Sequence, residues 1–248
     1  MAAVAAAGLA AGAVNTIVGS GSLVTLPTLL AVGLPPLAAN VTNTVGLIPG
    51  SVSGAVGYRR ELRGQTGRAA RLGVVAIAGG VLGAVLLLAF PSDVFEKVIP
   101  FLILFAVALT LAQPRLARRA AGRHGTERSE GPVLFAVVFG TAVYGGYFGA
   151  AQGVILLGFL GVLVDDHIQR LNALKNVITV LVNGAAAVLF IAFSHIRWSA
   201  AGLLAVGAVA GGQLGAVMGR RLPPNLLRAA IVLVGLAVSI KLFVDGFS

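Results

Sequence analysis

Hydrophobic residues in this chain fall into long runs, separated by short stretches that are polar or rich in glycine. A helix needs about 20 residues, with a range of roughly 17–25, to cross the hydrocarbon core of a bilayer. Most runs reach or approach that length, but 23–34 and 154–164 are too short. Each short run follows a glycine-rich break, so we expect it to be the second half of a broken or re-entrant element. The runs are 2–18, 23–34, 41–57, 72–90, 98–113, 132–148, 154–164, 173–193, 199–218 and 229–244.

Basic residues gather in three clusters between the runs, and by the positive-inside rule all three should face the cytoplasm. The loops 91–97 and 194–198 hold one basic residue each and should face outward. The clusters are Arg59, Arg60, Arg63, Arg68 and Arg71; Arg115, Arg118, Arg119, Arg123 and Arg128; and Arg220, Arg221 and Arg228.

These constraints predict an all-α polytopic membrane bundle of about eight segments. Segment 1–38 enters and returns from outside, segment 132–164 does so from inside, and three crossings follow each of them. An odd number of crossings inverts the second half relative to the first, which gives two inverted repeats with both termini outside. The predicted divisions are a first membrane repeat at 1–113, a basic cytoplasmic linker at 114–131 and a second membrane repeat at 132–248. If 1–34 and 132–164 span fully, the topology changes and the candidate site does not.

The composition supports this assignment. The chain is 58% hydrophobic and 10% charged, with a mean hydropathy of +0.98, whereas soluble domains carry about 25% charged residues. The net charge of +10 lies in loops between apolar segments, where it sets orientation and meets anionic lipid, so we expect no nucleic-acid partner. Because cysteine is absent, disulfides and thiol chemistry are excluded. Residues 1–18 lack a basic start, which favours a membrane element over a cleaved signal peptide.

Glycines spaced by four residues recur in the apolar runs and are typical of helices that pack closely in lipid. They are a structural signal and carry no chemistry. These glycines are Gly46, Gly50 and Gly54; Gly79 and Gly83; and Gly207, Gly211, Gly215 and Gly219.

One motif occurs twice, about 130 residues apart. In each half a glycine-rich break is followed, some 20 residues on, by amide side chains at the start of the next apolar segment. Polar groups and broken helices are costly in lipid, so their repeated placement indicates a binding site between the halves. The candidate substrate-binding residues are Gly19, Ser20, Gly21, Ser22, Asn40 and Asn43 in the first half and Gly149, Gln152, Gly153, Asn172, Lys175 and Asn176 in the second.

The breaks favour an anionic ligand. Backbone N–H groups at the start of a half-helix are unpaired and carry partial positive charge, which suits an oxyanion. Ser20 and Ser22 add hydroxyl donors in the first break, and Gln152 adds an amide in the second. The alternative is that the glycines only allow a tight turn.

In run 173–193 the polar residues Asn172, Asn176, Thr179 and Asn183 fall at i, i+4, i+7 and i+11, so they share one helix face. This stripe either lines a path for substrate or ions or forms hydrogen bonds between helices. Lys175 lies beside it. A buried lysine would indicate an anionic substrate. Alternatively, Lys175 reaches the cytoplasmic headgroups, because it lies only five residues past Arg170.

The sequence has no residue pattern typical of an enzyme or of a cofactor-binding site. The sequence holds no P-loop, no complete dinucleotide fingerprint and no buried pair of carboxylates or Ser-His-Asp set in its apolar runs. Asp165, Asp166 and His167 could form a proton relay or a weak metal site, but a loop in which Asp165 or Asp166 caps the next helix is favoured. We therefore expect no catalytic residues, no metal and no cofactor.

Two sets of residues, one in each half, carry a resemblance to a known family. They are Gly19 to Ser22, Leu26-Pro27, Leu29-Leu30, Gly33-Leu34-Pro35, Ala38-Ala39-Asn40, Thr42-Asn43, Ser51 to Arg60, Gly149 to Gly153 and Leu174-Lys175-Asn176. With these residues both halves resemble the sulfite exporter TauE/SafE family over essentially the whole chain. That family usually has Gly-x-Gly-Gly-Gly in the first break, where this chain has Ser22 and Leu23, and small residues in the second, where it has Ala151 and Gln152.

The resemblance implies a carrier in the cell inner (plasma) membrane that exports a small sulfur-containing anion such as sulfite or an organosulfonate. Two alternatives remain open, a passive channel for small anions and a membrane protein that docks a partner without transporting. The sequence indicates no oligomeric state.

Overall fold

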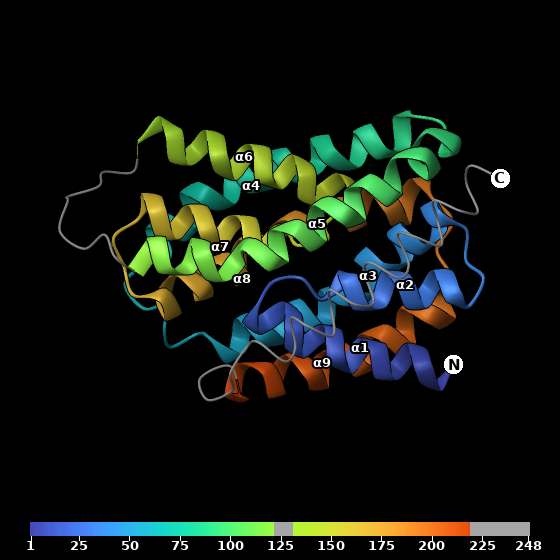
Figure 1. The fold of residues 1–248 in the computed structure, drawn as a ribbon, viewed down its shortest axis with the longest axis horizontal. Helices are drawn as coiled ribbons and strands as arrows, with labels where there is room; N and C mark the ends of the chain where they lie inside the picture. Colours follow the sequence, from blue (N-terminus) through green and yellow to red (C-terminus); the bar gives the residue numbers. More distant parts are fainter. Residues whose placement is uncertain (122–130, 219–248) are drawn as a thin grey trace.

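The computed structural model describes residues 1–121 and 131–218, with side chains through 112 and from 131 to 217. In these ranges the protein is entirely helical, which confirms the predicted fold class (Figure 1). The predicted run 229–244, the basic cluster after 219 and residues 122–130 of the predicted linker lie outside them. The helices are α1 (Ala2–Ile17), α2 (Ser22–Ala31), α3 (Pro36–Gly57), α4 (Thr66–Ala89), α5 (Ser92–Ala121), α6 (Pro132–Tyr147), α7 (Gln152–Leu163), α8 (Ile168–Phe193) and α9 (Trp198–Met218).

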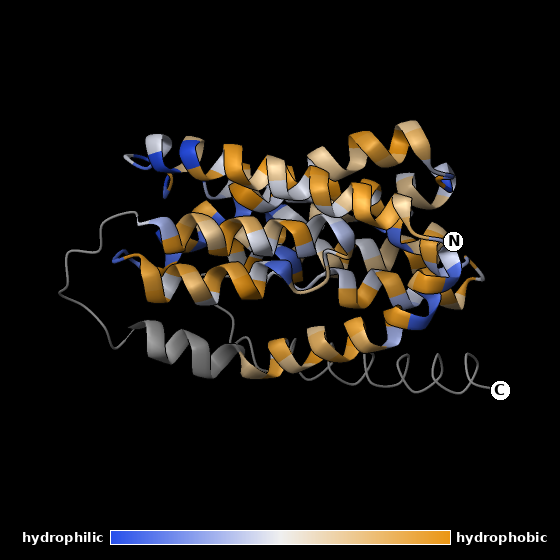
Figure 2. Ribbon diagram, turned by 90° about the horizontal axis from the view of Figure 1, so that it is seen from above, coloured by the Kyte–Doolittle hydropathy of each residue, from blue (hydrophilic) through white to orange (hydrophobic). Residues whose placement is uncertain are grey.

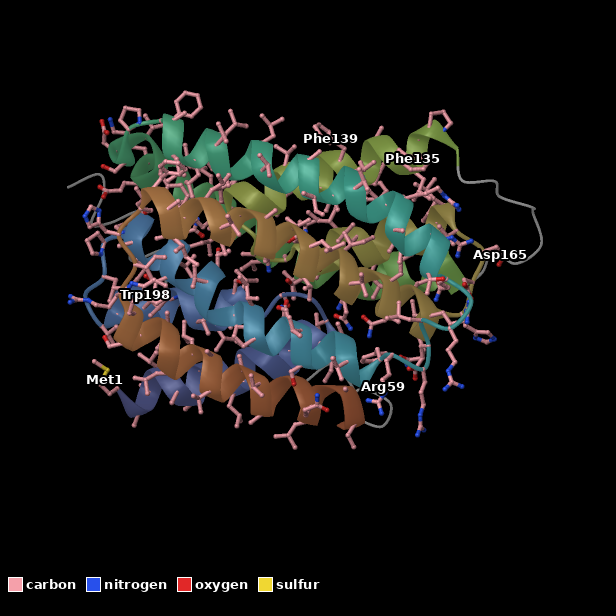
Figure 3. The ribbon with its side chains drawn as sticks, turned by 180° about the vertical axis from the view of Figure 1, so that it is seen from behind. Met1, Arg59, Phe135, Phe139, Asp165 and Trp198 are labelled. Atoms are coloured by element: carbon pink, nitrogen blue, oxygen red, sulfur yellow. The ribbon has the colours of Figure 1, made fainter. Side chains whose placement is uncertain are left out.

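Four of the described helices are long and apolar enough to cross a membrane, namely α4, the first 21 residues of α5, α8 and α9. Large apolar side chains cover their outer surfaces, as expected where helices face lipid. In Figure 2 hydrophilic residues gather at the two ends of the bundle and in a group near its middle. Figure 3 shows Phe139 on the outside of α6, pointing away from the bundle.

The α1–α2 and α6–α7 pairs are two hairpins, and each of their helices is shorter than a full crossing. Met1, at the start of α1, lines the same pocket as Val32 and Leu34, which follow α2, so the first hairpin opens at that end of the bundle. The second hairpin opens at the opposite end, where Asp165 lies after α7 (Figure 3). The two hairpins therefore point at each other. The inversion of one whole half relative to the other stays a prediction.

The largest helix contacts join the two halves reciprocally. Helix α1 packs mainly on α9, and α6 packs mainly on α4. Glycines make both contacts close: a Cβ built on Gly8 would lie 2.6 Å from the Leu204 carbonyl oxygen, and one built on Gly79 would lie 2.7 Å from the Phe139 carbonyl oxygen. The packing role predicted for the spaced glycines is confirmed for those in the described residues.

Several helix boundaries differ from the predicted runs, and α4 begins at Thr66 although its apolar run begins at 72. Helices α3 and α8 begin at Pro36 and Ile168, about five residues earlier than the apolar pattern indicates, because Asn40 and Asn172, which interrupt that pattern, are buried between helices. Proline suits the first turn of α3, since its missing N–H would be unpaired there. Helix α5 begins at Ser92, so the predicted loop 91–97 is mostly helical, and α5 continues to Ala121. The division into repeats and linker stays a prediction.

The loop before α8 also differs from its prediction. The residue that precedes the helix is His167, whose side chain makes no capping hydrogen bond. Neither Asp165 nor Asp166 occupies the cap. Instead, Asp166 Oδ1 accepts a hydrogen bond from Arg170 Nε at 2.7 Å, and Asp166 Oδ2 lies 3.5 Å from Arg68. Asp166 thereby ties the first turn of α4 to the loop before α8.

Candidate functional site

The two glycine breaks meet in the middle of the bundle. Gly19 and Gly149 have φ angles of +89° and +78°, a backbone conformation that favours glycine. The Gly153 N–H donates a hydrogen bond to the Gly19 carbonyl at 3.2 Å. A Cβ built on Gly153 would lie 2.6 Å from the Gly19 Cα, so the two tips touch through bare backbone. The ends of four half-helices thus converge on one point.

The C-terminal end of α1 is capped by two side chains from α8. The Lys175 ammonium donates to the carbonyl oxygens of Asn15 at 3.1 Å and Thr16 at 3.4 Å. The Asn172 amide nitrogen donates to the Thr16 carbonyl at 3.2 Å. Carbonyl groups in the last turn of a helix have no intrahelical partner and carry partial negative charge. The two side chains therefore offset the negative end of this half-helix.

The C-terminal end of α6 is capped in the same manner from the other half. Asn40 is the fifth residue of α3, as Asn172 is the fifth of α8. Its amide nitrogen donates to the Tyr147 carbonyl, the last of α6, at 3.1 Å. Each half thus supplies the cap for the broken helix of the other.

Asn43 links α3 to the start of α2. Its amide nitrogen donates to Ser22 Oγ at 3.1 Å, and its carbonyl oxygen accepts a short hydrogen bond from Thr25 Oγ1. The side chain holds the beginning of α2 in place within its own half.

Several buried polar atoms around the breaks have no hydrogen-bond partner within the part of the chain that the structure describes. Ser20, at the first tip, is 1% exposed and its hydroxyl is unpaired. Gln152 is equally buried and both polar atoms of its amide are unpaired, with the amide packed against Gly145. Asn176 Nδ2 and Thr179 Oγ1 on α8 are also unpaired. Buried polar atoms in native proteins almost always have partners, so these four residues leave hydrogen-bonding groups unused around the breaks.

Helix ends of both signs meet at the centre of the bundle. Two helix C-termini and two helix N-termini meet there, and protein side chains cap only the negative ends, at α1 and α6. The positive ends, at the starts of α2 and α7, follow Gly21 and Ala151, whose side chains have no capping atom. Backbone carbonyls pair with N–H groups in both first turns, as Gly19 does with Gly153. The protonated Lys175 adds a positive charge. Of the described residues, the carboxylates lie in loops and helix ends, away from this point.

The comparison with protein families identifies the chain. A family model described as "Sulfite exporter TauE/SafE" matches residues 4–242. The chain belongs to this family.

Relatives of this TauE/SafE protein are named as membrane transporters. It is 28% identical over 246 residues to "Probable membrane transporter protein YfcA" of Escherichia coli K12, and the matched region covers 95% of this chain and 87% of that protein. It is 30% identical over 245 residues to "Probable membrane transporter protein ORF9" of a Sinorhizobium species, covering 95% of this chain and 89% of the relative. A "Probable membrane transporter protein" of Haemophilus influenzae is 26% identical over 240 residues, covering 96% and 92%. No solved structure matches the chain.

The predicted site residues of this TauE/SafE protein lie around the crossing of the breaks. All are buried except Ser22 and Gly149, which are partly exposed. In the predicted polar stripe on α8, Asn172, Asn176 and Thr179 are buried, whereas Asn183 is partly exposed. Lys175 is 1% exposed, so it does not reach the headgroups, and its ammonium is held by backbone carbonyls.

Sequence reasoning missed Asn15 and Thr16, which supply the carbonyls that Lys175 contacts. A signal for them existed, because they are the polar pair in the last turn of an otherwise apolar run, directly before a glycine break. It also missed Tyr144, whose hydroxyl donates to the Ala150 carbonyl at 2.7 Å and thereby holds the second tip.

Proposed function

We propose that this membrane transporter exports a small sulfur-containing anion, such as sulfite or an organosulfonate, across the cell inner membrane. The observation that carries the proposal is the group of unpaired buried polar side chains around the starts of α2 and α7, beside the buried ammonium of Lys175. Backbone N–H groups at a helix start suit an oxyanion, and half-helix N-termini that face anionic groups are a feature of carriers with broken helices.

In this proposal the anion sits between the tips of the α1–α2 and α6–α7 hairpins. Ser20 and Asn176 donate hydrogen bonds to its oxygen atoms, and the amide of Gln152 reaches it from the second tip. The contact between Gly19 and Gly153 blocks the path between the two ends of the bundle. When the tips separate toward one end, the anion site opens to that end alone. Both termini lie outside, and the protein performs no catalytic step.

The test is flux into and out of liposomes that hold the purified protein. Radiolabelled sulfite and an organosulfonate should each be tried, and a carrier should saturate and show counterflow. Conductance without saturation or counterflow would indicate a channel instead. If neither anion moves and a second protein co-purifies in fixed ratio, the docking alternative replaces transport.

Ser20→Ala is the informative variant, with Ser199→Ala as its matched control, because Ser199 is exposed at the start of α9. A hydrogen bond to a charged group contributes about 1.5–3 kcal/mol, so Ser20→Ala should raise the KM for the anion about 10- to 100-fold. Ser199→Ala should leave KM unchanged. If Ser20→Ala and Ser199→Ala have equal KM values, the proposed anion site at the hairpin tips is wrong.

A further inference from the structure

Lys175 is a buried cation that meets no carboxylate among the described residues. It is 1% exposed, and its ammonium donates only to the carbonyl oxygens of Asn15 and Thr16. A charge buried at this depth is costly unless other groups compensate it. Here the compensation comes from backbone dipoles at the end of a half-helix.

The end of α1 has the chemistry of a small-cation site. Unwound carbonyls and half-helix C-terminal ends coordinate coupling cations in carriers with broken helices, and hard cations prefer oxygen ligands. A third oxygen lies at the same place, because Asn172 contacts the Thr16 carbonyl through its amide nitrogen and its Oδ1 has no partner among the described residues. Asn172 is 5% exposed, and a turn of its amide would present that oxygen to a cation.

We propose that the Lys175 ammonium occupies a cation site formed by the Asn15 and Thr16 carbonyls and acts as a resident counter-cation, so that no free coupling cation is needed there. The consequence for transport rests on the proposed function, but the site itself does not. Removing the lysine side chain should leave an oxygen-lined site that binds Na⁺, K⁺ or Li⁺.

The end of α6 supplies a comparison within the molecule. Asn40 caps its Tyr147 carbonyl, as Asn172 caps α1. Within the described part of the chain the only other lysine is Lys97, which is exposed near the start of α5. The ammonium is therefore a feature of one half-helix end, and Asn caps are common to both.

The first experiment measures cation binding without transport. Purified wild-type protein, Lys175→Ala, Lys175→Ser and the control Lys97→Ala are heated in chloride salts of Na⁺, K⁺, Li⁺ and choline at equal ionic strength. We expect at least one small cation to raise the Tm of Lys175→Ala and Lys175→Ser by about 2 °C or more relative to choline, the shift that 1 kcal/mol of ligand stabilisation gives in a protein of this size. Wild type and Lys97→Ala should show no difference between the four salts.

If Lys175→Ala does not fold, Lys175→Ser, which adds a hydroxyl oxygen to the site, carries the same comparison, and the wild-type measurement stands by itself. The proposal is overturned if wild type is stabilised by a small cation relative to choline. It is overturned equally if the purified Lys175 variants respond to none of the three cations, or if neither variant folds in any of the salts.

The second experiment repeats anion flux in the same four salts. Wild-type flux should be the same in all of them, and Lys175→Ala should show a KM for the anion that is lower in the small-cation salt by about 5-fold or more, the lower range of couplings between two sites. Lys175→Arg keeps the charge and should stay independent of the salt. A wild-type protein that moves no anion refutes the proposed function alone, whereas a small-cation requirement in wild-type flux refutes the resident counter-cation.

Discussion

The contact between the two hairpin tips leads to a sharp prediction for Gly153→Ala. The new Cβ would lie 2.6 Å from the Gly19 Cα and 3.1 Å from the Gly19 carbonyl oxygen. Ordinary carbon contacts lie near 3.5–4.0 Å, so the tips must separate by about 1 Å. The hydrogen bond between the Gly153 N–H and the Gly19 carbonyl, now 3.2 Å long, would then be lost.

Overpacking of this kind costs about 1–3 kcal/mol, which for a protein of this length lowers Tm by about 2–12 °C. Because the proposed anion site lies at these tips, we also expect sulfite flux in liposomes to fall by about 10-fold or more, equivalent to about 1.4 kcal/mol. Thermal unfolding in detergent and flux after reconstitution measure the two effects separately.

Gly140→Ala is the matched control. Gly140 lies in α6 of the same hairpin, and a Cβ built on it meets nothing within 4 Å. Alanine there should raise stability by about 0.5–1 kcal/mol through helix propensity and leave flux unchanged. If Gly153→Ala has the same Tm and the same flux as the wild-type protein, the direct contact between the tips is refuted.

Three further variants test other parts of the structure. Asn40→Ala removes the part-buried hydrogen bond to the Tyr147 carbonyl and should lower the unfolding free energy by about 0.5–1.5 kcal/mol. An unchanged Tm would contradict the capping role of Asn40. Gln152→Leu removes an amide with no partner among the described residues, so Tm should stay the same or rise. The KM for the anion should rise about 10-fold or more. A lowered Tm with an unchanged KM would show that the amide has a structural role instead. Asp166→Asn breaks a partly exposed pair with Arg170 and should cost less than about 1 kcal/mol, an effect that salt weakens; a larger loss of Tm that salt does not change would show a different role for this carboxylate.

The helical architecture could be predicted because lipid imposes a minimum length on each crossing. The runs before α2 and α7 stop at glycines, and neither α2 nor α7 has the length to span. This is why hairpins were expected at 1–34 and 132–164. The starts of α3 and α8 were predicted too late because hydropathy treats Asn40 and Asn172 as loop residues, whereas both are buried inside the protein.

The candidate site was predictable as a set of residues and less so as a set of contacts. The spacing of the polar residues on α8 fixed the face that they share, and Asn172, Asn176 and Thr179 on that face are buried. The partner of Asn172 was not predictable, because Thr16 lies 156 positions away and belongs to the other half. Nor could the sequence predict the environment of Lys175. Its flexible side chain could reach either the headgroups or the protein interior, and only the position of α1 places its carbonyls next to the ammonium.

The reciprocal packing of α1 on α9 and of α6 on α4 has a consequence for biosynthesis. The first helix is made and inserted long before α9 leaves the ribosome, so for most of translation its glycine-lined face has no protein neighbour. Neither half should therefore persist by itself in the cell, and the halves expressed as two separate polypeptides should protect each other from proteolysis. Helix α1 therefore reaches its native packing only late in translation, after α9 has been made.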